Sequence, residues 1–204
     1  IKIILIMIDL PLILALSAYY FAMFITPGPN NTMLTISGIK FGFKDTIPHI
    51  FGISSGHAIQ ISIVCLGLGS LFQKFPQIQD YLKWLCLFYL LYLAWSMIGS
   101  IKHHEVQSGR PLKFYEASLF QWVNPKAWTI ATMAGTAFFP REENILIAVI
   151  FVCLSAFLIN LPCISVWALF GASLKKYINN HLLKKIIEYF FSILLVLTGI
   201  YLVI

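Results

Sequence analysis

Long apolar runs dominate the sequence, and most are close to the length that crosses a bilayer. A transmembrane helix needs about 20 predominantly apolar residues. Six such runs follow one another, at 10–39 with an interruption near 26–31, and at 47–72, 81–101, 115–139, 145–170 and 185–204. We therefore expect an all-α polytopic membrane protein with six transmembrane helices.

Composition excludes several other classes of protein. Apolar residues make up 59% of the 204 residues and charged residues 11%, whereas soluble domains have roughly 45–50% and about 25%. The four cysteines lie in apolar runs without a C-x-x-C pair, which disfavours a disulfide or zinc framework. The adjacent His103 and His104 are expected to be solvated loop residues. We expect no metal and no cofactor. We also expect no nucleic-acid partner, because the net charge of +6 is spread over short connections between runs.

The distribution of basic residues predicts the orientation. With six spans, one side of the membrane carries nine Lys or Arg residues and the other carries four, so the first set should be cytoplasmic and both termini outside. The first set is Lys40, Lys44, Lys102, Arg110, Lys113, Lys175, Lys176, Lys184 and Lys185, and the second is Lys2, Lys74, Lys83 and Arg141. Met7 is a candidate natural start.

Two proline breaks divide the chain into corresponding halves. Pro27 and Pro125 lie 98 positions apart (125 − 27), and each interrupts the first span of a three-span set. Because three is odd, the two sets must cross the membrane in opposite directions. Spans interrupted by Gly or Pro at corresponding positions in two halves of a chain indicate the binding site of a transporter. We predict a single membrane domain over 1–204, with repeat one at about 7–101, a loop at 102–113 and repeat two at about 114–204.

The breaks expose backbone groups that a ligand could use. Proline has no N–H and disfavours helix at the preceding residue, so a continuous helix would lose the partners of the Met23, Ile25 and Gln121 carbonyls. A helix restarting after Pro29 would present free N–H groups near Asn30 and Asn31. Such an end attracts a carboxylate, while freed carbonyls suit an ammonium. The pattern thus favours an amino acid as ligand.

These motifs resemble the lysine exporter (LysE/RhtB) family, and the segment 117–124 is most similar to its cysteine and O-acetylserine exporter branch. The resemblance implies an exporter of amino acids or close derivatives in the bacterial inner membrane, driven by the proton-motive force, with six spans in two inverted repeats. It does not imply the exact substrate. The motif residues are Pro27, Gly28, Pro29, Asn30, Asn124, Pro125 and Lys126, with spaced glycines at Gly38, Gly42, Gly52 and Gly56.

Ionisable residues inside spans are functional candidates by default. Lys126 could face a substrate carboxylate, or it could snorkel or pair with a freed carbonyl for structure alone. His57 could relay the coupling proton, although a lone histidine between helices is more often simply hydrogen-bonded. Asp9 is expected at the membrane surface.

Further polar candidates lie beside the prolines. Asn160, two residues before Pro162, and Gln121, four before Pro125, could each cap freed carbonyls or contact a substrate. Gly52 and Gly56 are expected to let helices approach closely, which permits a homodimer without requiring one. The predicted substrate-binding set is Pro27, Gly28, Pro29, Asn30, Asn31, Gln121, Asn124, Pro125, Lys126 and Asn160.

The leading interpretation is a proton-antiport exporter of small neutral amino acids that works by alternating access. A membrane thiol-redox carrier of related plan would need cysteines near the breaks, where Asn30 and Asn124 stand instead. A passive small-solute pore could share the breaks and is only weakly excluded. An enzyme is not expected, because the sequence has no metal-binding histidine motif and no nucleophile–base constellation.

Overall fold

The computed structural model describes residues 8–68, 74–75, 77–98, 110–140, 144–177 and 181–203. Within these ranges the chain forms eight α-helices and no strand. Met7, His103, His104 and most of the predicted central loop, 102–109, lie outside them. The helices are α2 (Leu10–Ile25), α3 (Pro29–Phe41), α4 (Phe43–Ile63), α6 (Gln77–Met97), α7 (Phe114–Phe120), α8 (Pro125–Ala137), α9 (Ile145–Leu174) and α10 (His181–Val203), and the short turns η1 (Val64–Leu68) and η2 (Lys175–Tyr177) extend α4 and α9.

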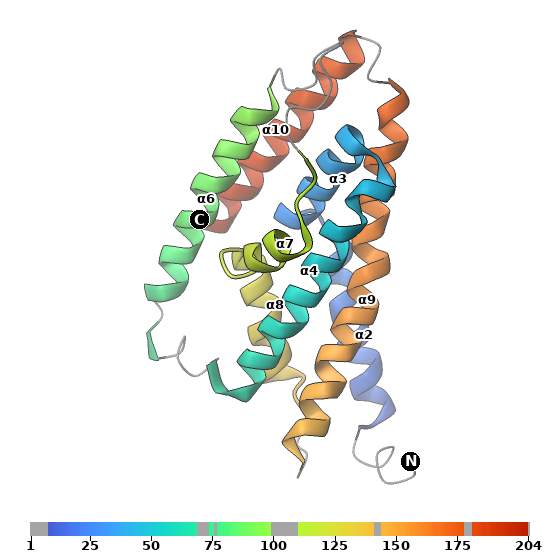
Figure 1. The fold of residues 1–204 in the computed structure, drawn as a ribbon. Helices are drawn as coiled ribbons and strands as arrows, with labels where there is room; N and C mark the ends of the chain where they lie inside the picture. The colour runs from blue at the N-terminus through green and yellow to red at the C-terminus, as the bar shows by residue number, and fades with distance from the viewer. Residues whose placement is uncertain are drawn as a thin grey trace.

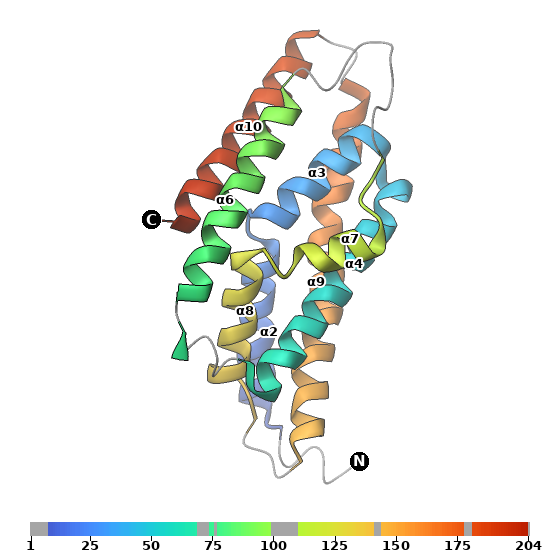
Figure 2. The same cartoon turned by 60° about the vertical axis from the view of Figure 1, so that its left-hand side comes forward.

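The longest helix, α9, organises the bundle. It packs against α2, α3 and α4, so one continuous helix lies beside both parts of the interrupted first span (Figures 1 and 2). Helices α6 and α10 run side by side as a separate pair. This pair contacts the rest of the bundle where α10 meets α3 and α6 meets α8.

Glycines set the closest helix approaches. A Cβ added at Gly38 of α3 would overlap the α9 backbone at Ala168, and one at Gly171 of α9 would overlap the α3 backbone at Thr35. Small residues allow this kind of backbone contact between membrane helices. The predicted packing glycines lie between α4 and α7, where a Cβ at Gly52 or Gly56 would overlap the α7 backbone. The two interrupted spans are thus tightly packed against α9 and α4.

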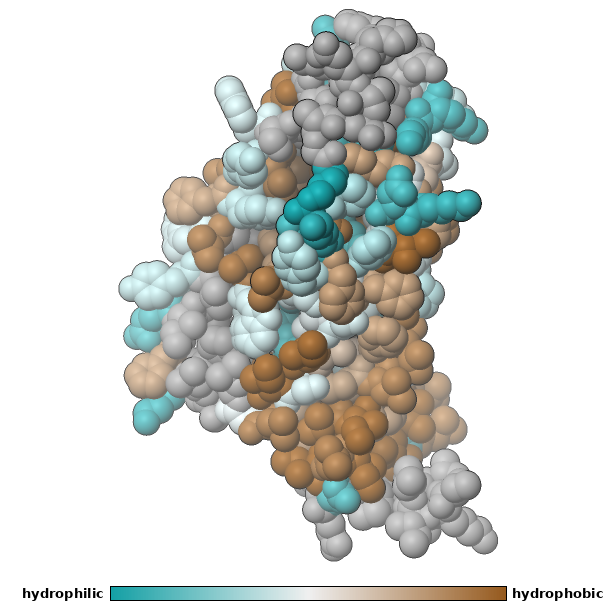
Figure 3. All heavy atoms as spheres, in the orientation of Figure 1, coloured by the Kyte–Doolittle hydropathy of each residue, from teal (hydrophilic) through white to brown (hydrophobic). Residues whose placement is uncertain are grey.

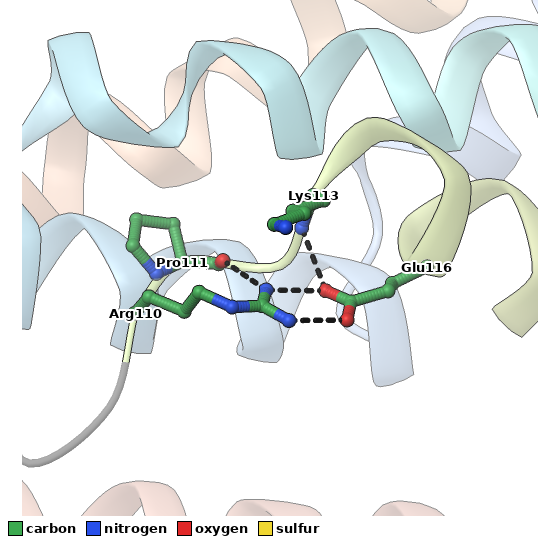
Figure 4. Close-up of polar contacts among 4 residues, drawn as sticks. All are labelled: Arg110, Pro111, Lys113 and Glu116. Atoms are coloured by element: carbon green, nitrogen blue, oxygen red, sulfur yellow. Dashed lines mark hydrogen bonds and ion pairs between the residues drawn. The ribbon is translucent and has the colours of Figure 1, made fainter.

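The start of α7 is fixed by a cluster of charged groups (Figure 4). The Glu116 carboxylate accepts hydrogen bonds from both terminal nitrogens of Arg110 and from the backbone N–H of Lys113. A glutamate in the first turn that reaches back to the residue before the helix satisfies one of the free N–H groups there. This cap positions the short helix that leads into the second break.

The surface and the helix lengths fit a multi-pass membrane protein. Apolar side chains gather on the lower part of the molecule in Figure 3, over α9 and the end of α4. Two stretches, Phe43–Gly67 and Ile145–Tyr177, are long and apolar enough to cross a membrane, and Leu10–Ile25 with Pro29–Phe41 makes a third if this pair, bent by 52°, is one span.

Among the described residues no further helix meets these limits, so the count of six spans stays a prediction. Helices α7 and α8 have 7 and 13 residues on either side of their break. Helices α6 and α10 begin four residues earlier than the predicted spans, and their first turns are polar. Helix α4 also begins four residues early, at Phe43 instead of Ile47, because the helix accommodates Pro48.

Candidate functional site

The first break separates α2 from α3. Helix α2 ends at Ile25, the residues Thr26 to Gly28 are extended, and Pro29 begins α3. Proline suits this first helical position because its missing N–H would have no partner there. Gly28 stands at the N-cap and provides no side chain to cap the helix. The N-terminus of α3 therefore keeps free N–H groups and a partial positive charge inside the bundle.

The second break is closed by its own residues. After α7, residues 121–123 form a turn, and α8 begins at Pro125. The Asn124 side-chain oxygen accepts a hydrogen bond from the Lys126 backbone N–H at 3.1 Å, which caps α8. The indole N–H of Trp128 donates to the Trp122 carbonyl at 2.8 Å. Asn124, predicted as a substrate ligand, thus serves as a helix cap in this conformation.

The structure brings the two breaks into direct contact. The Lys126 ammonium donates to the Thr26 carbonyl (3.0 Å), the Thr26 hydroxyl (3.0 Å) and the Pro27 carbonyl (3.1 Å). A Cβ at Gly28 would lie 2.9 Å from Lys126 Cδ, so the glycine makes room for this side chain. Residues 100 positions apart are therefore joined by one lysine.

A pair of amides forms a second bridge between the breaks. Asn30 Nδ2 donates to Gln121 Oε1 at 2.8 Å, and Gln121 Nε2 donates back to Asn30 Oδ1 at 3.2 Å. Gln121 is fully buried, and its Nε2 also donates to the Ala117 carbonyl. Since these hydrogen bonds join Gln121 to Asn30 of α3 and to Ala117 of α7, Gln121 links the two helices.

The carbonyls that the prolines would free accept hydrogen bonds from protein donors. The Thr26 hydroxyl donates to the Met23 carbonyl, the Trp167 indole to the Ile25 carbonyl and the Gln60 amide to the Gln121 carbonyl. We expected these oxygens to be available to a ligand ammonium. They are instead satisfied by side chains, because an unpaired carbonyl inside a bundle is costly.

Asn31 closes the end of α2 in the same way. Its Nδ2 donates to the Phe24 carbonyl at 2.8 Å and to the Thr26 carbonyl at 2.7 Å, and the residue is only 3% exposed. It was predicted to contribute a backbone N–H to the site. Its side chain has the additional function of holding the two parts of the interrupted span at their bend.

A small cavity lies between the two breaks, with a volume of about 20 Å³. This is enough space for about one water molecule. Its polar lining is Asn30, Asn31, His57, Asn124, Lys126 and Asn160. Its other lining residues are Met23, Phe24, Gly28, Ala127, Ile130 and Ile164.

Two polar residues from other helices complete the lining. His57 of α4 is 2% exposed and packs edge-on against the Phe24 ring, and its Nε2 has no hydrogen-bond partner among the described residues. Asn160 of α9 accepts a hydrogen bond from the Ser54 hydroxyl at 2.7 Å. The cavity is thus formed by both interrupted spans together with α4 and α9.

Sequence reasoning did not identify Thr26, Gln60 or Trp167. All three donate to carbonyls at the breaks, yet Gln60 and Trp167 come from helices far away in the sequence. The available signal is that each is a strong hydrogen-bond donor within an apolar run. Which carbonyl it reaches depends on how the helices pack, and no local pattern contains that.

Comparison with known proteins agrees with this architecture. The sequence model of the family described as "LysE type translocator" matches residues 21–204. The chain belongs to the LysE family. This is a family of translocators, which agrees with the expectation that the chain is not an enzyme.

Several similar proteins carry the name of an efflux protein. The chain is 30% identical over 148 residues to the "Cysteine/O-acetylserine efflux protein" of Salmonella typhimurium (strain LT2), covering 72% of this chain and 75% of that protein. It is 28% identical over 147 residues to the protein of the same name from Escherichia coli (strain K12), with the same coverage. No solved structure matches the chain.

The polar groups that line the cavity of this LysE-family chain determine which ligands it can bind. It combines a lysine ammonium, an uncapped helix N-terminus and four amide side chains, without a carboxylate in the lining. Such a set stabilises anions, because the N-terminal end of a helix and a cation both attract negative charge. It is suited to binding a small carboxylate at the junction of the two breaks.

Proposed function

We propose that the chain exports small neutral amino acids or their derivatives, of the cysteine and O-acetylserine type, from the cytoplasm by proton antiport. The observation that carries this proposal is the meeting of the two interrupted spans at a cavity through Lys126. The relatives named as efflux proteins support the substrate class. The substrate carboxylate binds at the N-terminus of α3 and Lys126, and residues from both breaks surround it.

The contacts between helices support six spans in two inverted repeats. If α2/α3 corresponds to α7/α8, α4 to α9 and α6 to α10, most contacts exchange with one another. The α2–α9 contact matches α7–α4, α3–α9 matches α8–α4, and α10–α3 matches α6–α8. The α4–α9 and α6–α10 contacts each map onto themselves. This is the pattern expected of two halves related by a two-fold axis in the membrane plane.

The small size of the cavity supports the proposal of alternating access. At about 20 Å³ it cannot admit an amino acid without movement of the surrounding helices. The bonds of Lys126 and of the Asn30–Gln121 pair join one repeat to the other, so transport requires these bonds to exchange as the halves move. His57 is the candidate for proton coupling, because it is buried in the cavity wall with Nε2 unpartnered among the described side chains.

Counterflow in proteoliposomes tests the proposal. The purified chain is reconstituted with unlabelled cysteine, O-acetylserine, threonine or lysine inside, and uptake of the labelled compound is followed with and without a pH gradient. We expect counterflow of the neutral compounds and stimulation of net export by a gradient that returns protons to the cytoplasmic side. Absence of counterflow for every compound would refute the exporter, and insensitivity to the gradient would refute proton coupling.

The orientation is tested separately. We propose a multi-pass protein of the bacterial inner membrane with both termini outside the cytoplasm. Fusing a reporter that is active only outside the cytoplasm to the C-terminus should give full activity, whereas a fusion after Lys175 should be inactive. The reverse result would invert the predicted topology.

A further inference from the structure

The cavity between the breaks has an unbalanced charge. Lys126 carries the one formal charge among the residues that line it, and no Asp or Glu is present in that lining. The uncapped N-terminus of α3 adds partial positive charge at the same place. The Glu116 carboxylate lies instead at the start of α7, paired with Arg110. The site therefore complements a carboxylate and provides no charged partner for an ammonium.

Backbone oxygens do not replace the missing anion. At the first break, the Phe24 and Thr26 carbonyls accept from Asn31, and the Thr26 and Pro27 carbonyls accept from Lys126. At the second break, the Gln121 carbonyl accepts from Gln60. A ligand ammonium would compete with these donors, and the charge of Lys126 would repel it.

A buried histidine offers a ligand a further hydrogen-bonding group in this cavity. His57 lines the same cavity and is 2% exposed, and its Nε2 lacks a partner within the described part of the chain. A buried polar atom without a partner costs free energy, which a ligand that hydrogen-bonds to it recovers. A neutral imidazole has one donor and one acceptor nitrogen, so it can pair with an uncharged amide as well as with an ammonium.

We infer that this site recognises small monocarboxylates by the carboxylate, and that it does not require the α-ammonium. Its ligands include N-acylated small amino acids, whose net charge is −1, and it discriminates against cationic amino acids. The apolar part of the lining, Met23, Phe24, Ile130 and Ile164, would contact a short acyl or alkyl group once the surrounding helices have moved apart. This inference rests on the proposed function and defines the substrate class of the same site.

Equilibrium binding to the purified full-length chain tests the inference without relying on transport. Alanine, N-acetylalanine and lysine are titrated by calorimetry in detergent. We expect N-acetylalanine to bind within threefold of alanine, and lysine at least tenfold more weakly. Binding of N-acetylalanine at least tenfold weaker than that of alanine, or no measurable binding of either, would overturn the inference.

Matched variants locate the binding. Lys126→Met should weaken N-acetylalanine binding at least tenfold, whereas Lys44→Met, at an exposed lysine outside the cavity, should leave it unchanged. Equal binding by Lys126→Met and the unaltered chain would also overturn the inference. Failure of counterflow with this binding intact would count against the exporter alone, so the two proposals can fail independently.

Discussion

At both helix breaks a proline begins the next helix, but the two breaks are stabilised differently. At the second break, Asn124 caps α8 and the Trp128 indole closes the turn, while Gln60 of α4 donates to the Gln121 carbonyl from a distance. At the first break, α3 has no side-chain cap, and the local donors Thr26 and Asn31 act together with the distant Trp167 and Lys126. The helix that follows the second break is thus capped locally, whereas the first break is also held by a lysine from the opposite half of the chain.

This difference assigns separate tasks to the two repeats. A break held by its own residues remains intact when the surrounding helices move. A break held by Lys126 from the opposite repeat changes when that contact is lost. We propose that the second break is the more rigid support that carries the lysine, and that ligand binding and helix movement are linked at the first break. The following predictions test this division, beginning with the largest effect.

Removing the charge of Lys126 should have the largest effect on transport. Lys126→Met eliminates three hydrogen bonds to the first break, and bonds to charged groups contribute about 1.5–3 kcal/mol each. We expect counterflow to fall by about 10-fold to 100-fold (1.4 kcal/mol is tenfold), while the protein still inserts. Lys44→Met is the control. Normal counterflow by Lys126→Met would remove the lysine from the mechanism.

The next largest effect is expected at Asn31. Asn31→Leu keeps the approximate size but removes the donor to the Phe24 carbonyl, and a buried group left unsatisfied costs about 1–3 kcal/mol. The Thr26 carbonyl loses the same donor but keeps its bond from Lys126. We expect about a tenfold loss of counterflow and a lower melting temperature. Thr35→Val provides the comparison, because that hydroxyl bonds only within its own helix, to the Asn31 carbonyl. If both variants behave alike, the first break does not depend on Asn31.

Gly28→Ala should have a smaller effect that depends on Lys126. The added methyl would lie 2.9 Å from Lys126 Cδ, and a flexible side chain can adjust to such a contact. We expect counterflow to fall a fewfold, roughly 1 kcal/mol. In a Lys126→Ala background the same substitution should cause no further loss, since contacting residues give non-additive effects. Additive losses would show that Gly28 acts through something other than the lysine.

The smallest effect on transport is expected at Asn124. Asn124→Ala removes a helix cap, which costs about 1 kcal/mol of stability, and Asn124→Ser should restore it. Asn144→Ala is the matched control. The Asn144 side-chain oxygen caps α9 by accepting from the backbone N–H two residues later, as Asn124 does, but Asn144 is exposed and lies outside the cavity. Similar shifts of the melting temperature in both alanine variants are predicted. A large transport defect in Asn124→Ser would instead make Asn124 a substrate ligand.

Local sequence signals predicted the positions of the breaks. Pro29 and Pro125 each begin a helix, because a proline at the first helical position loses no hydrogen bond. Family resemblance predicted the translocator class, which the family match confirms. This local chemistry explains why the helix starts predicted at the two breaks are close to those in the structure.

The partners across the bundle could not be predicted in the same way. Trp167 reaches the Ile25 carbonyl across 142 positions, and Gln60 reaches Gln121 across 61. Such pairs depend on how α9 and α4 pack, which a single apolar run does not specify. For this reason the ammonium subsite was expected at carbonyls that the fold has already satisfied.

Cross-linking the two breaks tests the central claim most directly. With the native cysteines replaced, Asn30→Cys and Gln121→Cys are introduced together and treated in membranes with a short bifunctional thiol reagent. Because these side chains lie within hydrogen-bonding distance, at 2.8 Å, we predict efficient cross-linking and loss of counterflow, and little cross-linking when Asn30→Cys is paired with the exposed Thr136→Cys. Absence of the cross-link, or full counterflow by the cross-linked protein, would contradict a site formed and moved by the two breaks.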